Sequence, residues 1–122
     1  MRKHVLLVED EANIIEAVRF LLTRDGWHVE AHADGNTAMA RIVERQPDLV
    51  ILDLMLPGKS GLDILRDLRG NPTFAELPVL MLTARGQEQD RDLAAQAGAS
   101  RFMTKPFSNV EVLEAVRELA AQ

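Results

Sequence analysis

Short apolar runs alternate with stretches of helical period along the whole chain of 122 residues. The apolar runs have the length of buried strands, and the stretches between them repeat hydrophobic residues every three or four positions. This alternation predicts five strands, each followed by a helix. The predicted strands are His4 to Val8, Trp27 to Ala33, Asp48 to Asp53, Pro78 to Thr83 and Arg101 to Thr104, and the predicted helices cover residues 11–25, 35–46, 60–70, 86–97 and 108–121.

Two of these helices carry end signals. Residues 14–22 of the first helix place hydrophobic side chains on one face, and Gly26 follows as a C-cap. The last helix opens with Ser108, and Glu111 follows at the spacing of a capping box. The first helix should therefore pack on the sheet, and the start of the last is well defined.

The polarity of the strands predicts their order. Residues 5–8, 49–52 and 79–82 are continuously apolar, as parallel strands covered on both faces are. In contrast, residues 28–33 alternate polar with apolar, and residues 101–104 are short and mixed, which is typical of edges. With right-handed crossovers, the simplest arrangement is an α/β fold of the flavodoxin-like, doubly wound kind: a five-stranded parallel sheet in the order 2-1-3-4-5 with five flanking helices, forming one domain over residues 1–122.

Composition narrows the functional classes. Charged residues make up 27% of the chain, no apolar run has the length needed to span a bilayer, and no export signal is visible. There is no cysteine, and the formal net charge is −5. We therefore expect a soluble, cytoplasmic protein without disulfides or membrane association. The acidic balance argues against direct nucleic-acid binding by this domain, because such modules present a basic face.

Polar residues follow four of the five predicted strands. Glu9, Asp10 and Glu11 follow the first, Asp53 ends the third, Thr83 ends the fourth and Lys105 follows the fifth. Ligands bind such sheets beyond the carboxyl ends of the strands, where the strand order reverses. Because neighbouring strands lie about 4.8 Å apart, Asp10 and Asp53 can surround one hard cation, for which Mg²⁺ is the best match.

Each of these residues also has an ordinary structural role. Acidic residues such as Glu9 to Glu11 complement the N-terminal dipole of a helix, and an aspartate such as Asp53 is a common turn former. Thr83 suits a strand, and Lys105 suits a solvated surface. Their joint arrival at one rim of one predicted sheet is what favours a functional site.

Four segments resemble the CheY-like receiver domains of bacterial response regulators: residues 5–11, 53–61, 82–84 and 105–107. The resemblance implies that Asp53 accepts a phosphoryl group from the phosphohistidine of a sensor histidine kinase or phosphotransfer protein. It also implies a Mg²⁺ cofactor and a cis peptide bond at Pro106. The implied metal ligands are Glu9 (through water), Asp10, Asp53 and the backbone carbonyl of Met55, and the implied phosphoryl contacts are Thr83 and Lys105.

The same resemblance implies a switch. In the family, the threonine that corresponds to Thr83 moves toward the phosphoryl group, and the aromatic ring that corresponds to Phe102 fills the vacated space. This changes the surface of the fourth helix, fifth strand and fifth helix, through which an output domain or protein is controlled. Ser100 and Arg101 stand where receivers of winged-helix transcription factors carry two acidic residues, so the dimerisation of that subfamily is not implied.

Met55 and Arg85 follow Asp53 and Thr83 by two residues, at the family positions nearest the water that hydrolyses the aspartyl phosphate. Neither is a neutral amide or a carboxylate that could orient this water, so we expect slow self-dephosphorylation. The chain should act as a signalling switch that catalyses its own phosphorylation and dephosphorylation, and not as a turnover enzyme. Whether it is a single-domain regulator or part of a longer protein stays open.

Two other functions share this architecture. Haloacid-dehalogenase-like phosphatases also use a strand-end aspartate, but they need an acid/base aspartate at the position of Met55, whose side chain cannot transfer a proton. A flavodoxin-like cofactor binder needs amides and hydroxyls after the first strand, where this chain has acidic residues. His28 and His32 lie about 13 Å apart on one predicted strand, too far to share a metal, and are interpreted as edge residues.

Overall fold

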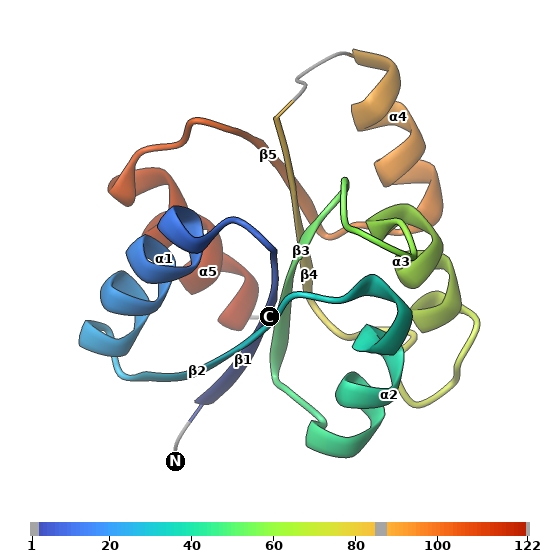
Figure 1. Cartoon of the computed structure of the whole chain (residues 1–122), viewed down its shortest axis with the longest axis horizontal. Helices are drawn as coiled ribbons and strands as arrows, with labels where there is room; N and C mark the ends of the chain where they lie inside the picture. The colour runs from blue at the N-terminus through green and yellow to red at the C-terminus, as the bar shows by residue number, and fades with distance from the viewer. Residues whose placement is uncertain (1–2, 85–87, 122) are drawn as a thin grey trace.

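The computed structural model describes residues 3–84 and 88–121, and these form a parallel five-stranded sheet in the order β2-β1-β3-β4-β5 with five helices (Figure 1). The predicted α/β fold and strand order are confirmed. The elements are β1 (Lys3–Val8), α1 (Ala12–Arg24), β2 (Trp27–His32), α2 (Gly35–Arg45), β3 (Leu49–Asp53), α3 (Gly61–Arg69), β4 (Val79–Thr83), α4 (Glu88–Ala97), β5 (Arg101–Thr104) and α5 (Asn109–Ala120).

The sheet separates two hydrophobic clusters. Helices α1 and α5 lie on one side of it, and α2, α3 and α4 lie on the other (Figure 1). Successive side chains of a strand point to opposite faces, so Val5 and Leu7 join the cluster beneath α1 and α5, whereas Leu6 and Val8 join the cluster beneath α2 and α3. Both faces of β1 are therefore covered, which explains its continuous apolar run.

Burial follows the predicted ranking of the strands. Every residue of β3 and β4 is buried, and so are the last four residues of β1. Most residues of β2 and β5, at the two edges of the sheet, are only partly buried. Asp53 and Thr83, at the ends of β3 and β4, therefore belong to strands that are buried throughout.

The boundaries of most elements differ from the prediction by one residue, as expected where ends are read from pattern alone. Helix α1 ends at Arg24 with Asp25 as its C-cap, and Gly26 follows with a φ of 93°, a left-handed conformation that suits glycine. Gly26, which the sequence predicts as the C-cap, therefore lies one position beyond the observed cap. The capping box of Ser108 and Glu111 is present at the start of α5.

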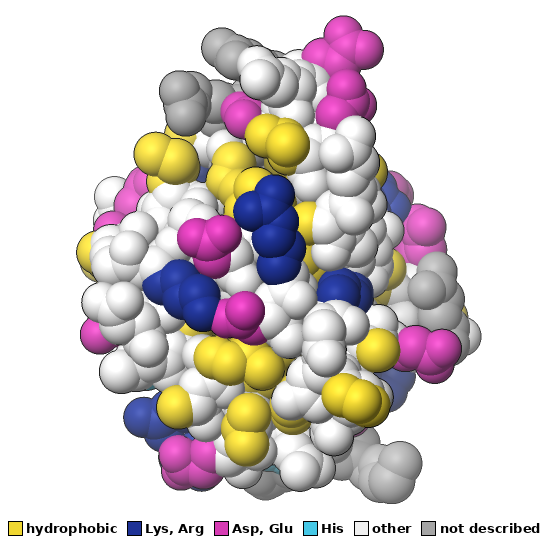
Figure 2. All heavy atoms as spheres, turned by 90° about the vertical axis from the view of Figure 1, so that its right-hand side faces the viewer, with side chains coloured by type: hydrophobic (Ala, Val, Ile, Leu, Met, Phe, Trp, Pro, Cys, Tyr) yellow, Lys and Arg dark blue, Asp and Glu magenta, His cyan; other side chains and the backbone are white. Residues whose placement is uncertain are grey.

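The surface shows no single large apolar face in the view of Figure 2, which looks onto the side formed by α2, α3 and α4. Hydrophobic side chains occur there as separate small groups among acidic and basic ones. Within residues 3–84 and 88–121, none of the helices has the length and apolar content required to cross a bilayer.

Candidate functional site

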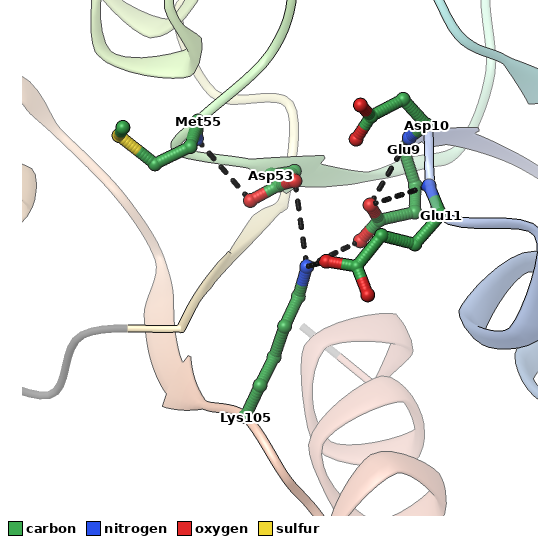
Figure 3. Close-up of polar contacts among 6 residues, drawn as sticks. All are labelled: Glu9, Asp10, Glu11, Asp53, Met55 and Lys105. Atoms are coloured by element: carbon green, nitrogen blue, oxygen red, sulfur yellow. Dashed lines mark hydrogen bonds and ion pairs between the residues drawn. The ribbon is translucent and has the colours of Figure 1, made fainter.

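The register of the central strands brings the acidic residues together. Val8 of β1 lies opposite Leu52 of β3, so the residues that follow them, Glu9 and Asp53, reach the same rim of the sheet. Asp10 is the next residue after Glu9, in the segment that leads to α1. Ligand atoms of Glu9, Asp10 and Asp53 all lie within 4.8 Å of one another (Figure 3).

The three carboxylates differ in exposure. Glu9 is fully buried and Asp53 is 3% exposed, whereas Asp10 is exposed. This set of hard oxygen donors, with one side open to solvent, fits the small number of protein carboxylates and the retained waters that Mg²⁺ prefers. The residues present therefore match the expected cofactor.

Lys105 supplies the positive charge of the site. Its side chain is 9% exposed, and Figure 3 shows its ammonium group between Asp53, at the end of β3, and the acidic side chains that follow β1. Nζ lies 2.8 Å from Oε1 of Glu9 and 3.4 Å from Oδ2 of Asp53. Glu11 completes the surroundings, with its Oε1 at 3.3 Å from Nζ.

These contacts shift two pKa values. Burial, the largest effect, raises the pKa of the Glu9 carboxyl and outweighs the opposing hydrogen bond from Lys105, while the nearby charge of Asp53 raises it further. Burial alone lowers the pKa of the Lys105 ammonium, but the contacts with Glu9 and Asp53 prevail and the pKa is raised. The backbone amides of Asp10 and Glu11 also donate to Oε2 of Glu9, at 3.0 and 3.2 Å.

Backbone contacts fix Lys105 next to the end of β4. Its N–H donates to the carbonyl of Thr83 at 2.7 Å, and Thr83 itself is fully buried. The Lys105–Pro106 peptide bond is cis, the isomer that the resemblance implied. Thr83 and Lys105 therefore approach the rim from adjacent strands.

Met55 contributes its main chain to the site. Its N–H donates to Oδ1 of Asp53 at 3.2 Å, and its side chain, which is 58% exposed, points away from this carboxylate in Figure 3. The thioether can therefore neither orient a water near Asp53 through a strong hydrogen bond nor transfer a proton. Arg85, the second residue expected near that water, lies outside the described residues.

Comparison with known families identifies this arrangement. The model of the response regulator receiver domain matches residues 5–117. The chain belongs to this family. Receiver domains are signalling switches of two-component systems and not classical enzymes, so the family match sets aside the phosphatase and the flavodoxin-like alternatives.

Solved structures agree with the family model. A protein from Chloroflexus aurantiacus with a known crystal structure is 31% identical to this chain in sequence. The alignment covers 100% of both chains, and the two structures superpose with a TM-score of 0.95. The BeF3-activated receiver domain of RstA from Klebsiella pneumoniae is 30% identical over 98% of this chain and 100% of that chain, with a TM-score of 0.89. The receiver domain of a sensor histidine kinase from Pseudomonas aeruginosa, which holds a magnesium ion in its active-site cleft, is 26% identical over 100% of both chains, with a TM-score of 0.90.

Phe102 lies away from the acidic rim of this receiver domain. It is half-buried on β5 and packs at the margin of the cluster beneath α2, α3 and α4. The guanidinium of Arg91, on α4, lies 5.6 Å from the centroid of its ring, within the range of a cation–π contact. The predicted switch aromatic is therefore in contact with the helix whose surface it is expected to change.

Sequence reasoning places Glu11 in the acidic segment after β1 but misses its contact with Lys105. Only the fold brings these residues, 94 positions apart, within 3.3 Å. The available signal was charge: a third carboxylate after the first strand faces the same rim as a lysine after the fifth. In this receiver domain, Glu11 gives Lys105 a partner at the solvent side of the site.

Proposed function

We propose that Asp53 accepts a phosphoryl group from the phosphohistidine of a sensor histidine kinase or phosphotransfer protein. The observation that carries this proposal is the position of the Asp53 carboxylate, which is 3% exposed and lies 3.4 Å from the Lys105 ammonium at the carboxyl end of a central strand. A carboxylate held beside a cation at an otherwise acidic rim suits attack on an anionic donor.

The reaction exchanges one bond to phosphorus for another. An oxygen of Asp53 attacks the phosphorus, the P–N bond of the phosphohistidine breaks, and its electron pair returns to the imidazole. Lys105 offsets the charge on the transferred oxygens, since opposite charges about 4 Å apart attract by about 4 kcal/mol at an effective dielectric near 20. The N–H of Met55, already directed at Asp53, holds the carboxylate in place.

Mg²⁺ is the cofactor that we propose for this transfer. Asp10, Asp53 and the backbone carbonyl of Met55 would hold it directly, and Glu9 would do so through water. When bound, it supplies the positive charge that lets an anionic nucleophile approach an anionic phosphoryl donor. The grouping of Glu9, Asp10 and Asp53 supports this assignment, as does the magnesium ion in the relative from Pseudomonas aeruginosa.

Phosphorylation would be read out through the α4-β5-α5 surface. In our proposal, Thr83 moves to contact the phosphoryl group, Phe102 changes its packing, and the altered surface controls an output domain or partner protein. The contact between Phe102 and Arg91 of α4 supports a path from β5 to that surface. Replacing Thr83 with alanine should leave Asp53 competent for phosphorylation while uncoupling Phe102 from it.

We infer one domain over residues 1–122, located in the cytoplasm, that associates directly with neither nucleic acid nor membrane. It acts as a self-phosphorylating switch and not as a turnover enzyme. The net charge of −5 supports the absence of direct nucleic-acid binding, and the alternating pattern of strands and helices along the whole chain supports a single domain.

The experiment that tests the proposed function uses a small-molecule phosphoryl donor, so that no cognate kinase has to be known. The protein is incubated with acetyl phosphate, with and without Mg²⁺, and its intact mass is measured. We expect the gain of one phosphoryl group with Mg²⁺ and none with EDTA. Asp53→Asn should gain none, and Asp48→Asn, which changes an aspartate at the opposite end of β3, should behave as the parent. Equal labelling of Asp53→Asn would overturn the assignment.

A further inference from the structure

Two exposed histidines face each other at the amino end of the sheet. His4 of β1 and His28 of β2 are direct partners in the strand register, and their ring centroids lie 4.8 Å apart at an interplanar angle of 63°. The two residues are 24 positions apart in the sequence and become neighbours only through strand pairing. The close pair is therefore a product of the fold.

The separation of the rings suits chelation of one metal ion. Zinc binds imidazole nitrogen at about 2.0–2.1 Å, and with N–Zn–N angles of about 90–109° the centroids of two bound rings lie roughly 4.5–5.2 Å apart. The observed 4.8 Å falls within this range. Because both side chains are exposed on adjacent strands, rotation about their side-chain torsions can direct one nitrogen of each ring to a common point.

We propose that His4 and His28 form a binding site for a borderline divalent cation, with Zn²⁺ as its ligand. Imidazole nitrogens favour Zn²⁺ over Mg²⁺, which prefers oxygen, so the pair selects a class of ion different from that of the acidic rim. Glu9 follows His4 by five positions along the chain, or about 17 Å at about 3.3 Å per residue. The two sites are therefore distinct.

The surroundings of the pair are compatible with a cation. On the other side of β1, a carboxylate oxygen of Asp48 accepts a hydrogen bond from the backbone N–H of His4 at 2.8 Å, which places a negative charge beside the strand. Water completes the coordination of the ion, because the described residues place no third histidine or carboxylate within ligand distance of both rings. Bound Zn²⁺ would clip the edge strand β2 to the central strand β1.

The test is a calorimetric titration of the full chain with ZnCl₂ at about pH 8, where imidazole is a neutral ligand. Excess Mg²⁺ is present throughout to compete for the acidic rim. The variants are His4→Ala, His28→Ala and the matched control His32→Ala. His32 lies on β2 like His28, but its ring contacts Thr37. Because an ion that binds only the folded state raises Tm, melts with and without Zn²⁺ provide a second readout.

We expect the parent and His32→Ala to bind Zn²⁺ with equal affinity and to gain equally in Tm. His4→Ala and His28→Ala should each weaken binding at least tenfold and lose the gain in Tm, since one imidazole cannot chelate. Equal binding by all four proteins would overturn the proposal, as would a loss in His32→Ala as large as that in His28→Ala. Absence of Zn²⁺ binding by the parent would also overturn it, whatever Asp53 does in the phosphorylation assay.

Discussion

The ammonium group of Lys105 lies closer to Glu9 than to Asp53, at 2.8 Å against 3.4 Å. Glu9 is fully buried, so Lys105 compensates a carboxylate that water does not reach. The lysine that we expect to contact the phosphoryl group therefore also has a structural task in the metal-free protein. These two tasks lead to the first prediction.

Replacing Lys105 with methionine should destabilise the metal-free protein by about 3–5 kcal/mol, because Glu9 would remain buried without its cation. Adding Glu9→Gln should restore part of this loss, since no buried charge is then left without a partner. Chemical denaturation of the parent, both single variants and the double variant measures the coupling. Strictly additive effects would contradict a direct Glu9–Lys105 interaction.

A salt bridge 2.6 Å long joins Asp25, at the C-terminal end of α1, to Arg117. This ion pair predicts a pH dependence of the protein's stability. The hydrogen bond from Arg117 lowers the pKa of the Asp25 carboxyl, so the fold favours its ionised form. This stabilisation is present above the ordinary pKa of aspartate and is lost as the pH falls through the lowered value.

Thermal melts should therefore show a slightly lower Tm for Asp25→Asn than for the parent at neutral pH. The difference should shrink as the pH falls below the ordinary pKa of aspartate. It should disappear at a pH below the lowered pKa of Asp25, where the carboxyl of the parent is protonated as well. Glu114→Gln, the same change of charge on the exposed face of α5, is the control. A difference in Tm that stays constant down to that pH would argue against the ion pair.

Asp10 should affect stability and function in opposite directions. It adds a third negative charge next to Glu9 and Asp53, so Asp10→Asn should relieve repulsion and stabilise the metal-free protein by about 1 kcal/mol or less, because Asp10 is exposed and Lys105 already offsets part of the repulsion. The same variant should lose Mg²⁺ affinity and phosphorylation.

Melts of the parent and Asp10→Asn, each with and without Mg²⁺, separate these effects. A variant that gains as much Tm from Mg²⁺ as the parent would show that Asp10 is no part of a metal site. A less stable metal-free variant would indicate that Asp10 mainly complements the N-terminus of α1.

The lifetime of the phosphorylated state should depend on Met55. Its exposed thioether points away from Asp53 and cannot hold a water in line with the phosphorus, whereas an asparagine amide at this position could. Met55→Asn should therefore shorten the lifetime of the aspartyl phosphate, and Met55→Leu should leave it unchanged. The decay of the phosphorylated mass after removal of the donor measures both. An unchanged or longer lifetime for Met55→Asn would contradict this role.

Features that depend on pattern or on local spacing could be predicted from the sequence. The continuous apolar runs of residues 49–52 and 79–82 identified the central strands because a strand covered on both faces has no polar positions. The capping box at Ser108 was predictable because it requires only two residues at fixed spacing.

Contacts between distant residues were harder to predict. The Glu11–Lys105 contact depends on the conformations of two long side chains that the fold brings together. The His4–His28 pair depends on the register of β1 with β2, which places the two residues opposite each other. No local pattern in either strand records this register.

The central claim, that Asp53 is the phosphoacceptor, is tested most directly by locating the acyl phosphate itself. Phosphorylated protein is treated with borohydride, which reduces an aspartyl phosphate to homoserine, and the peptides are sequenced by mass spectrometry. We predict homoserine at position 53 only in samples that were phosphorylated in the presence of Mg²⁺. Position 10 should remain an unmodified aspartate in every sample. Homoserine at position 10 or at another aspartate, with position 53 unmodified, would contradict the account.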